Sequence, residues 1–570
     1  MTSVKTYGAV GDGVHDDTAA IQAALADGRS SSTQDYYGLP KALYFPPGTY
    51  LVHDTLQWVG CCVTLQGAGP GASIIRLAPS ASGFGNSSDP KPLIITPNLS
   101  GNESFRQNIW DLGLSIGPDN PGATALSYIS NNTGSVHDAV ITSEDGKAHT
   151  GIDLTRKYSG PLMIRDTAIQ GFDVGIDLEN AEYSATMENI SLKDQNVAGI
   201  RNVSQPISIL GLTSVNQVPA VTNNNGFVVL INGTLTGGSS SNPALQTNST
   251  MYLRNVSSSG YKQTLSSTMS GYTAAVTGSI SQRVIGNPMT LTGNIADGSL
   301  GLTINPTPSF LSSSLSDWDA FVPRWYGDTA GLQTLMNSGK HTIYFPFEPY
   351  LAYNEADVTV PDSVDRIVGF SSIINGSTAG TNGGGIRLIV TSNSTTPLVV
   401  EQFGYGMKID HRGSRPVVIK NGKYTYYSSP GAGNLYLEDV DIEGFTIQKG
   451  QQVWARQLDD EFNGTKITNA GSLWILGLKT EHAGTVINTT SGGKTELLGG
   501  LIYPSQSVPS SNVAFQSTDA QVSYMYSEQS YCSGCGYAIE IKETRSGSSK
   551  QITSSASKGW TLPLFIGYQQ

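Results

Sequence analysis

The chain has 570 residues, a length at which a single compact core is unusual, so two domains are expected. Only 14% of the residues are charged, below the usual share of about 25%, whereas glycine, serine, threonine and asparagine are abundant. This composition argues against a helical protein and predicts a β-rich chain with many turns. The net charge of −12, without a basic run, argues against a nucleic-acid partner or an anionic membrane surface.

No stretch approaches the ~18–20 apolar residues of a membrane span, and no apolar signal segment follows Met1. We therefore expect no membrane association, and either an intracellular protein or a chain whose leader has been removed. Thirteen Asn-x-Ser/Thr sequons, among them those at Asn86, Asn98 and Asn102, exceed the roughly seven expected by chance. The excess favours a secreted glycoprotein.

Four cysteines occur as two close pairs, Cys61 with Cys62 and Cys532 with Cys535. They fit two buried thiols plus a turn, a Cys532–Cys535 bond, or a bridge from one pair to the other, and any disulfide would need an oxidising compartment. A zinc site from these cysteines has poor geometry, and the seven histidines are scattered. No metal ion or other cofactor is therefore predicted.

A motif near the N-terminus recurs in the second half of the chain. Residues 17–22 read Asp-Thr-Ala-Ala-Ile-Gln, and residues 328–333 read Asp-Thr-Ala-Gly-Leu-Gln. Each is followed by a Tyr-Phe-Pro segment. The pattern predicts a short helix and then a strand in each half, with Asp17 or Thr18 as the first N-cap. The acidic residues of the motif are expected to serve the cap and not catalysis.

Short β-type runs separated by Gly, Asn and Ser follow each motif, and the clearest recur every 20–25 residues. This period is typical of the coils of a solenoid and not of tight hairpins. We therefore predict an all-β fold of two tandem parallel β-helix domains with short capping helices, packed side by side. The predicted boundaries are 1–300 for the first domain, 301–320 for a crossover linker and 321–570 for the second domain.

The second half shows the repeat best, because residues 453–461 superpose on residues 473–481 at an offset of 20. Like residues stacked on successive coils are typical of a parallel β-helix. The superposition pairs tryptophans, leucines and glutamates: Trp454 with Trp474, Leu458 with Leu478, and Glu461 with Glu481.

The opening motif, Tyr-Gly-Ala-Val-Gly-Asp-Gly from Tyr7 and then Asp-Asp-Thr-Ala-Ala-Ile-Gln to Gln22, resembles that of the pectate-lyase-like right-handed β-helix superfamily. With its second copy and the segments 453–461 and 473–481, the chain resembles, over almost its whole length, the two-β-helix exo-β-1,3-glucanases of glycoside hydrolase family fifty-five. The resemblance implies right-handed coils and an inverting laminarinase that acts in a cleft between the two helices. It also implies a secreted monomer whose partner is β-1,3-glucan.

Inverting hydrolysis needs two carboxyl groups roughly 6.5–9.5 Å apart, one to protonate the leaving oxygen and one to activate water. Side chains on adjacent coils, whose backbones lie about 4.8 Å apart, can splay to the lower end of that range. We predict Glu481 as the general acid and Glu461 as the residue that holds or activates water. Glu528, about two coils further on, is predicted to lie near the same column and to be able to replace either. The alternative is that these are solvated edge carboxylates, and Glu496, offset from the column, is expected to be structural.

Further site residues are expected across the cleft and along it. The resemblance implies that Gln195 and Ser214, on successive coils of the first domain, position water; the alternative is a polar ladder inside the solenoid. Apolar faces of sugars pack on aromatic rings, although each aromatic side chain could instead belong to the core. The candidate sugar platforms are Trp454, Trp474, Tyr503, Tyr524 and Tyr531.

Two other functions fit the predicted fold. A polysaccharide lyase or polyuronide hydrolase would need basic side chains in its groove, whereas the charge of −12 and the glutamate column fit a neutral glucan better. A non-catalytic, tailspike-like glycan-binding protein is disfavoured, because a duplicated chain can build its own cleft. The basic residues available to a lyase are Arg156, Lys157, Arg165, Arg456 and Lys479.

Overall fold

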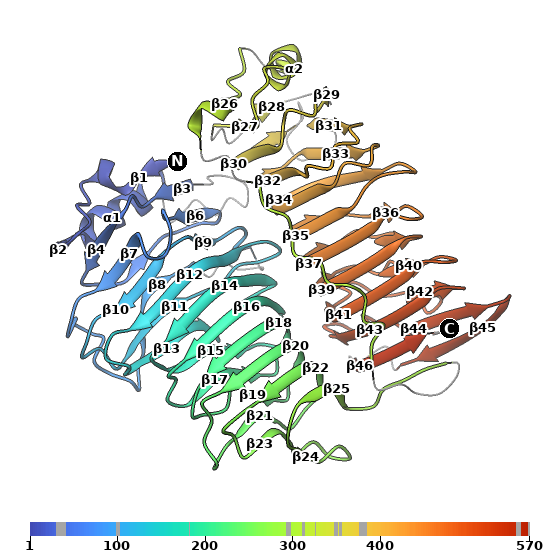
Figure 1. Cartoon of the computed structure of the whole chain (residues 1–570), viewed down its shortest axis with the longest axis horizontal. Coiled ribbons are helices and arrows are strands. Elements are labelled where there is room, and N and C mark those ends of the chain that lie inside the picture. Colours follow the sequence, from blue (N-terminus) through green and yellow to red (C-terminus); the bar gives the residue numbers. More distant parts are fainter. Residues whose placement is uncertain are drawn as a thin grey trace. The chain divides into compact units, whose positions relative to one another are not determined.

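The computed structural model divides into two compact units, Met1–Asn287 and Pro288–Gln570. Each unit is a stack of coils built from parallel strands, coloured from blue to green in the first unit and from green to red in the second (Figure 1). The described residues are 1–29, 41–97, 103–181, 183–291, 298–310, 314–324, 327–346, 351–352, 356–375, 385–554 and 560–567, with the backbone alone for 351–352 and 375.

The first unit contains a large sheet and a second sheet on another side of the coils. The path of the large sheet is β1 (Thr2–Ser3), β3 (Lys41–Tyr44), β6 (Val63–Gln66), β9 (Asn108–Trp110), β12 (Ser135–Ser143), β14 (Leu162–Gln170), β16 (Ala185–Lys193), β18 (Pro206–Val215), β20 (Phe227–Thr236), β22 (Met251–Ser258) and β25 (Ile280–Ile285), joined by β2 (Asp12–Asp16), β4 (Gly48–Val52), β7 (Ser73–Leu77) and β10 (Gly113–Ile116). The second sheet comprises β24 (Ala274–Val276), β23 (Gln263–Ser267), β21 (Pro243–Thr247), β19 (Val221–Asn224), β17 (Ala198–Val203), β15 (Phe172–Glu179), β13 (Ala148–Leu154), β11 (Ala123–Ser127), β8 (Lys91–Ile95) and β5 (Leu56–Gln57).

The second unit repeats this plan. Its large sheet follows β26 (Trp318–Ala320), β27 (Thr342–Tyr344), β30 (Arg366–Asn375), β32 (Leu398–Tyr405), β34 (Val417–Ser428), β35 (Leu435–Ile442), β37 (Gln452–Asp460), β39 (Ser472–Thr480), β41 (Lys494–Ile502), β43 (Gln521–Glu528) and β46 (Trp560–Gly567), joined by β28 (Leu351–Ala352), β29 (Ala356–Thr359), β31 (Ile386–Val390) and β33 (Met407–His411). Its smaller sheet comprises β36 (Phe445–Ile447), β38 (Ile467–Asn469), β40 (Ile487–Thr489), β42 (Val513–Thr518), β44 (Ile539–Arg545) and β45 (Ser548–Thr553).

The strand register confirms the predicted solenoid period. Ile164 pairs with Met187 and Met187 pairs with Ile209, so the chain advances 22–23 residues per coil. These apolar residues are buried and stack inside the solenoid, coil upon coil. Neighbouring strands run parallel until the last coil of each unit, where β25 and β24, and then β46 and β45, pair antiparallel.

A left-handed residue recurs within each coil and explains the abundance of Gly, Asn and Asp. At this position φ lies between +46° and +77° on five successive coils of the first unit. Only residues without a Cβ, or with a short polar side chain, adopt this region readily, so the turn selects glycine, asparagine and aspartate. The five residues are Asp166, Asn189, Gly211, Asn232 and Asn255.

Both duplicated motifs form the predicted helices, α1 (Thr18–Ala26) and α2 (Thr329–Met336), beside the 3-10 turns η1 (Val4–Tyr7) and η2 (Leu315–Asp317). Asp328 caps α2 by accepting a hydrogen bond from the Gly331 amide. Asp17 stands at the N-cap of α1 but accepts instead from the amides of Val10 and Gly11, so it holds the glycine-rich loop. Both aspartates are therefore structural.

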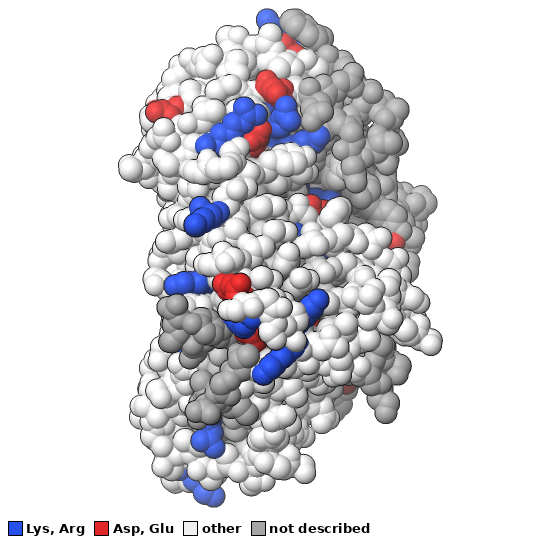
Figure 2. All heavy atoms as spheres, turned by 90° about the vertical axis from the view of Figure 1, so that its right-hand side faces the viewer, with Lys and Arg blue, Asp and Glu red and all other residues white. Residues whose placement is uncertain are grey.

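The cysteines form two local disulfides, Cys61–Cys62 and Cys532–Cys535, and no bridge between the pairs. Charged side chains are sparse on the face shown in Figure 2, as the composition implies. Within the described part of the chain, no helix is long and apolar enough to span a membrane. Residues 301–310, predicted as a linker, belong to the second unit, because the amides of Gly301 and Leu302 bind the Glu496 carboxylate.

Candidate active site

The carboxyl ends of β37 and β39 bring two glutamates to one sheet edge. The register pairs Trp454 with Trp474 and Asp460 with Thr480, which confirms the predicted offset of 20. Glu461 and Glu481 each follow the last residue of these parallel strands. Because parallel strands end at the same edge of a sheet, the two carboxyl groups meet there.

A buried lysine joins these glutamates. Lys479 Nζ donates to Glu481 Oε1 at 2.8 Å, also contacts Glu461 Oε1, and lies 3.3 Å from Asp459 Oδ1. The Tyr503 hydroxyl donates to the same Glu481 oxygen at 2.7 Å. Lys479 and Asp459 are fully buried, whereas about a fifth of each glutamate side chain is exposed (20% for Glu461 and 22% for Glu481). The lysine is thus a fixed cation beneath two accessible carboxyl groups.

Ionisable side chains extend this cluster over four coils, with a lysine at each end and two aspartates between them. Lys423 pairs in register with Asp441, Asp441 with Asp459, and Asp459 with Lys479. Lys423 Nζ lies 3.0 Å from Asp441 Oδ2. The column therefore contains two lysines and two aspartates, and Glu461 and Glu481 follow it at the same sheet edge.

The surroundings separate the pKa values of the two glutamates. Burial raises the pKa of Glu461, the charges of Asp441 and Glu481 add to this rise, and Lys479 opposes it. Burial also acts on Glu481, but the Lys479 charge and the hydrogen bonds from Lys479 and Tyr503 outweigh it and lower the pKa of Glu481 to about 2. These opposite shifts favour Glu461 as the proton-bearing member of the pair, whereas Glu481 was predicted as the general acid.

The shared lysine also brings the two carboxyl groups together. Two oxygens that share one ammonium as hydrogen-bond acceptors lie within about 6 Å of each other. Lys479 therefore draws one oxygen of Glu461 and one of Glu481 toward the same nitrogen atom.

A second buried pair lies next to the cluster. Asp460 accepts hydrogen bonds from the amides of Phe462 and Gly444, and burial raises the pKa of its carboxyl group to about 8. Lys466 is fully buried, its Nζ has no hydrogen-bond partner among the described residues, and burial lowers its pKa to about 8. The charges of Glu461 and Glu481 act on Lys466, so this lysine contributes to the field around both glutamates.

Glu528 lies one position off the glutamate column, and its surroundings contradict the role predicted for it. The register pairs it with Ile502, one position before Tyr503, so it faces the interior of the coil. There it accepts a hydrogen bond from the Tyr537 amide at 2.8 Å, and only 2% of the residue is exposed. Burial, and then the charge of Glu540, raise the pKa of Glu528 to about 9. It is a buried carboxyl group and not a substitute for Glu461 or Glu481.

This burial predicts a pH-dependent stability that Glu528→Gln should remove. A carboxyl group whose pKa is raised on folding binds more protons in the folded state, so stability falls as pH rises from the unfolded pKa, about 4.5, toward 9. The loss is at most about 1.4 kcal/mol per pH unit. In urea unfolding, the free energy of unfolding of Glu528→Gln should match that of the parent at pH 4 and exceed it at pH 8. Parallel curves for the two proteins across this range would contradict the assignment.

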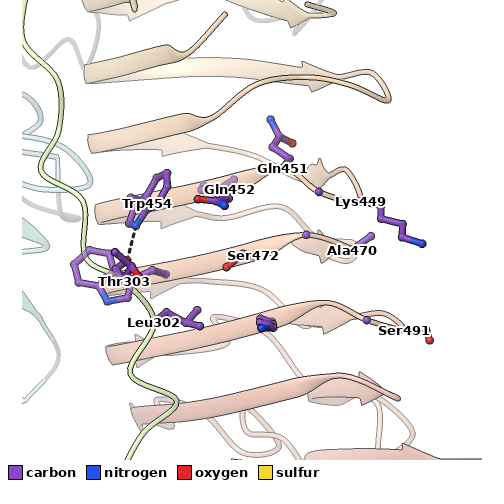
Figure 3. A pocket seen from close by; sticks show the side chains of 15 residues that line it. Leu302, Thr303, Lys449, Gln451, Gln452, Trp454, Ala470, Ser472 and Ser491 are labelled. Carbon is purple, nitrogen blue, oxygen red and sulfur yellow. Dashed lines mark hydrogen bonds between the residues drawn. The ribbon is translucent and has the colours of Figure 1, made fainter. Parts of the chain in front are cut away.

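The tryptophan column lies at the other end of the same strands, under a strap formed by residues 298–305. Trp454 Nε1 donates to the Thr303 carbonyl at 2.8 Å, the bond drawn in Figure 3. Its ring stacks on Tyr436 at 5.0 Å, and the Arg456 guanidinium lies 5.0 Å from the ring of Trp474. Both tryptophans line a cavity of about 480 Å³, but only 4% and 1% of them is exposed. They are packing residues and not the open sugar platforms that were predicted.

The predicted aromatic platforms on the last coils divide into core and surface residues. Tyr524 is fully buried, with its ring stacked on Phe515 at 4.6 Å, so it belongs to the core. Tyr503 lies at the glutamates, and its ring meets Tyr531 edge-on at 5.4 Å. Tyr531 is 43% exposed and is therefore the predicted platform with an accessible ring.

Gln195 and Ser214 are structural, contrary to their predicted role in positioning water. The Gln195 side chain donates to the carbonyls of Ile169 and Lys193 and accepts from Asn216 Nδ2. Ser214 Oγ accepts from the same Asn216 nitrogen and is fully buried. The two residues belong to a polar ladder inside the first solenoid, the alternative reading of these positions. Glu496 is structural as predicted, since it binds the strap amides.

Asp459 and Asp441 were not predicted as site residues, and Lys479 was given no part in the site. A signal was present, because the offset of 20 that superposes the two glutamates also superposes Asp459 on Lys479. A cation stacked on an anion, two residues before each glutamate, indicates an ion pair in the same column. Among the residues with described coordinates, no group of His, Cys, Asp or Glu has the arrangement of a metal site.

The fold and this site define a β-helix protein with a lysine-centred carboxylate cluster. Residues 1–224, which lie within the first unit, match the family model described as "Rhamnogalacturonase A/epimerase, pectate lyase-like". The chain is 26% identical over 220 residues to a glucan 1,3-beta-glucosidase of Cochliobolus carbonum, a match that covers 35% of this chain and 26% of that protein. It is 30% identical over 177 residues to the mannuronan C5-epimerase AlgE5 of Azotobacter vinelandii, covering 30% of this chain and 15% of that one.

Among solved structures, the chain is similar to sacteLam55A from Streptomyces sp. SirexAA-E, with 11% identity, a TM-score of 0.42 and coverage of 95% of this chain and 97% of that one. The chain thus spans about a quarter or less of the two curated relatives named above.

Proposed function

We propose that the protein is a glycoside hydrolase that cleaves β-1,3-glucan at Glu461 and Glu481. The observation that carries this proposal is the pair of accessible carboxyl groups on one buried ammonium, with pKa values shifted in opposite directions. An acid and a base held side by side are what glycosidic hydrolysis requires. The partial match to a glucan 1,3-beta-glucosidase supports the choice of substrate.

In the proposed reaction, protonated Glu461 gives its proton to the glycosidic oxygen while the bond from that oxygen to the anomeric carbon breaks. Ionised Glu481 takes a proton from a water molecule, whose oxygen bonds to the anomeric carbon. Lys479 stays charged throughout, because Asp459 and Glu461 raise its pKa well above its ordinary value against the effect of burial. Its role is to hold both glutamates and to keep Glu481 ionised.

We further propose that water attacks directly, with inversion, as the family resemblance implies. Inversion requires room for a water molecule between Glu481 and the anomeric carbon, which a separation of roughly 6.5–9.5 Å between the two carboxyl groups provides. Proton NMR of the first glucose released from laminarin should show the α-anomer. Initial release of the β-anomer would instead establish attack by Glu481 through a covalent intermediate.

The cellular setting is also a proposal. Two disulfides and thirteen sequons support secretion and glycosylation, and we further propose that the protein acts on extracellular glucan as a monomer. Asn86 is exposed and thus accessible, while Asn98 and Asn102 lie outside the described residues. Secretion from a eukaryotic host, followed by glycosidase treatment and mass measurement, tests this assignment.

Substrate assays separate the hydrolase from the alternative functions. The protein is incubated with laminarin, polygalacturonate and alginate, and products are followed by reducing ends and by the ultraviolet absorbance of unsaturated sugars. Glucose as the first product from laminarin supports an exo-acting β-1,3-glucanase, and longer oligosaccharides would indicate endo action. Unsaturated products would establish a lyase, and binding without products would favour a glycan-binding protein.

The hydrogen bond from Tyr503 to Glu481 predicts a shift in the pH profile. Tyr503→Phe removes a donor that favours the ionised form of Glu481, so the pKa of Glu481 should rise. A hydrogen bond to a charged group contributes about 1.5–3 kcal/mol, which corresponds to roughly one to two pH units. The acid limb of kcat/KM on laminarin should move to higher pH by that amount. An unchanged acid limb would show that Glu481 is not the ionised member of the pair.

A further inference from the structure

A polar groove in the first unit is separate in sequence from the candidate active site. It has a volume of about 480 Å³ and crosses the second sheet of that unit, from β8 to β17. Cavities of about 300–1,000 Å³ are typical of small-molecule sites. We define the Asp177 groove by its principal lining residues: Ser127, His149, Asp153, Arg156, Asp177, Glu179 and Arg201.

The floor of the Asp177 groove is one column of polar side chains. Ser127 pairs in register with Asp153, Asp153 with Asp177, and Asp177 with Arg201. Four successive coils extend over about 14 Å, since each step between strands is about 4.8 Å. The column therefore offers hydrogen-bonding groups at regular intervals along a length that suits a short oligomer.

The hydrogen bonds of the groove fix its floor and leave its rim open. Arg201 makes a bidentate contact with Asp177, with Nε 2.7 Å from Oδ1. Asp153 accepts from Ser127 Oγ and from the amide and hydroxyl of Thr155. Glu179 is exposed on the rim, and His149 is half-buried with Nδ1 2.8 Å from the Thr150 hydroxyl. A ligand would thus meet carboxylate acceptors beside guanidinium and imidazole groups.

The charges of the groove favour a neutral ligand. Arg201 is matched by Asp177, and Arg156 donates to the carbonyls of Thr96 and Ser127. Asp153 and Glu179 add negative charge that would repel a polyuronide. Hydroxyl groups both donate and accept, so a neutral sugar chain can satisfy the carboxylates and the cations together.

We propose that the Asp177 groove is a second carbohydrate-binding site, which holds a neutral oligosaccharide without cleaving it. The choice of β-1,3-glucan as its ligand rests on the proposed function. A polymer held in such a groove stays near the protein between cleavage events, which raises its effective concentration. The groove should therefore matter for long glucans and not for short ones.

Calorimetry on the Glu481→Gln background tests the site, because that variant should bind sugar without hydrolysing it. Laminarihexaose is titrated into Glu481→Gln and into the same protein with His149→Ala and Glu179→Ala. In the protein with His149→Ala and Glu179→Ala, the groove variant, we expect the Kd of one binding event to rise at least tenfold. The same event should persist in a Lys193→Ala control, since Lys193 is an exposed residue on β16 outside the groove. Identical isotherms for parent and groove variant, or equal binding of oligogalacturonate, would overturn the proposal.

Kinetics with an intact Glu481 supply a second measurement. With Glu481 intact, the double variant His149→Ala/Glu179→Ala should keep the parent's kcat/KM for laminaritriose, while its KM for an insoluble β-1,3-glucan should rise about tenfold. Glu179→Ala alone serves if the double variant fails to fold. If the parent hydrolyses laminarin but binds no second sugar, the proposed groove site is refuted and the proposed function stands. If sugar binds at the groove but laminarin is not hydrolysed, the proposed function is refuted and the groove site stands.

Discussion

Glu481→Gln is expected to lower kcat/KM on laminarin by about a thousandfold, within the 10²–10⁴-fold contribution of a positioned acid or base. The amide keeps an oxygen that can accept from Lys479 and Tyr503, so the packing of the site is retained. Lys479 also keeps its contacts with Asp459 and Glu461. The thermal transition should therefore stay nearly unchanged, and release of reducing ends should fall to the background rate.

The matched control is Glu144→Gln in the first unit. Glu144 has a similar exposure of 31% and accepts from Arg76, but it lies far along the chain from the glutamate column. Its substitution should leave the rate unchanged. Full activity in Glu481→Gln would refute the assignment of Glu481, whereas an equal loss in both variants would point to an effect of charge and not of catalysis.

Lys479→Met should destabilise the protein by about 3–5 kcal/mol, because it removes the partner of a buried charge. Asp459 is fully buried, and both of its carboxylate oxygens lack a hydrogen bond within the described part of the chain, so the Lys479 ammonium is its compensation. Burial and the nearby carboxylates raise the pKa of Asp459 and the Lys479 charge opposes them, so without Lys479 this group must either remain an unpaired buried charge or take up a proton. Urea denaturation at pH 7 measures the loss, and activity should disappear with it.

The double variant Lys479→Met/Asp459→Leu separates charge from packing. Replacing both members of a buried pair by apolar residues often changes stability little. The double variant should therefore recover most of the stability lost in Lys479→Met without recovering activity. Lys423→Met is the control, because Lys423 is 25% exposed and its loss leaves less buried charge. If the free energy of unfolding of Lys479→Met lies within about 1 kcal/mol of the parent's, the cluster is solvated and not buried.

The tryptophan column and Glu528 show what could be predicted from the sequence and what could not. The offset of 20 predicted the stacking of Trp454 on Trp474, since one coil repeats the residue types of the last. It did not predict which aromatic rings are accessible, because Trp454 is covered by the Thr303 strap, 151 residues away in the chain. Glu528 was misplaced for a related reason: β43 is displaced relative to β41 by an irregularity between Leu498 and Leu501, and one residue of slippage reverses the facing of every side chain.

The sequence by itself determined the class of fold, the two capped β-helices and the column that holds Glu461 and Glu481. These follow from local periodicity, because each coil repeats the same pattern of buried and turn residues. Only the tertiary structure decided the charges at the site. The pKa values of the glutamates depend on the burial of Lys479 and on neighbours from other coils and from Tyr503, and such desolvation has no signature in a linear pattern.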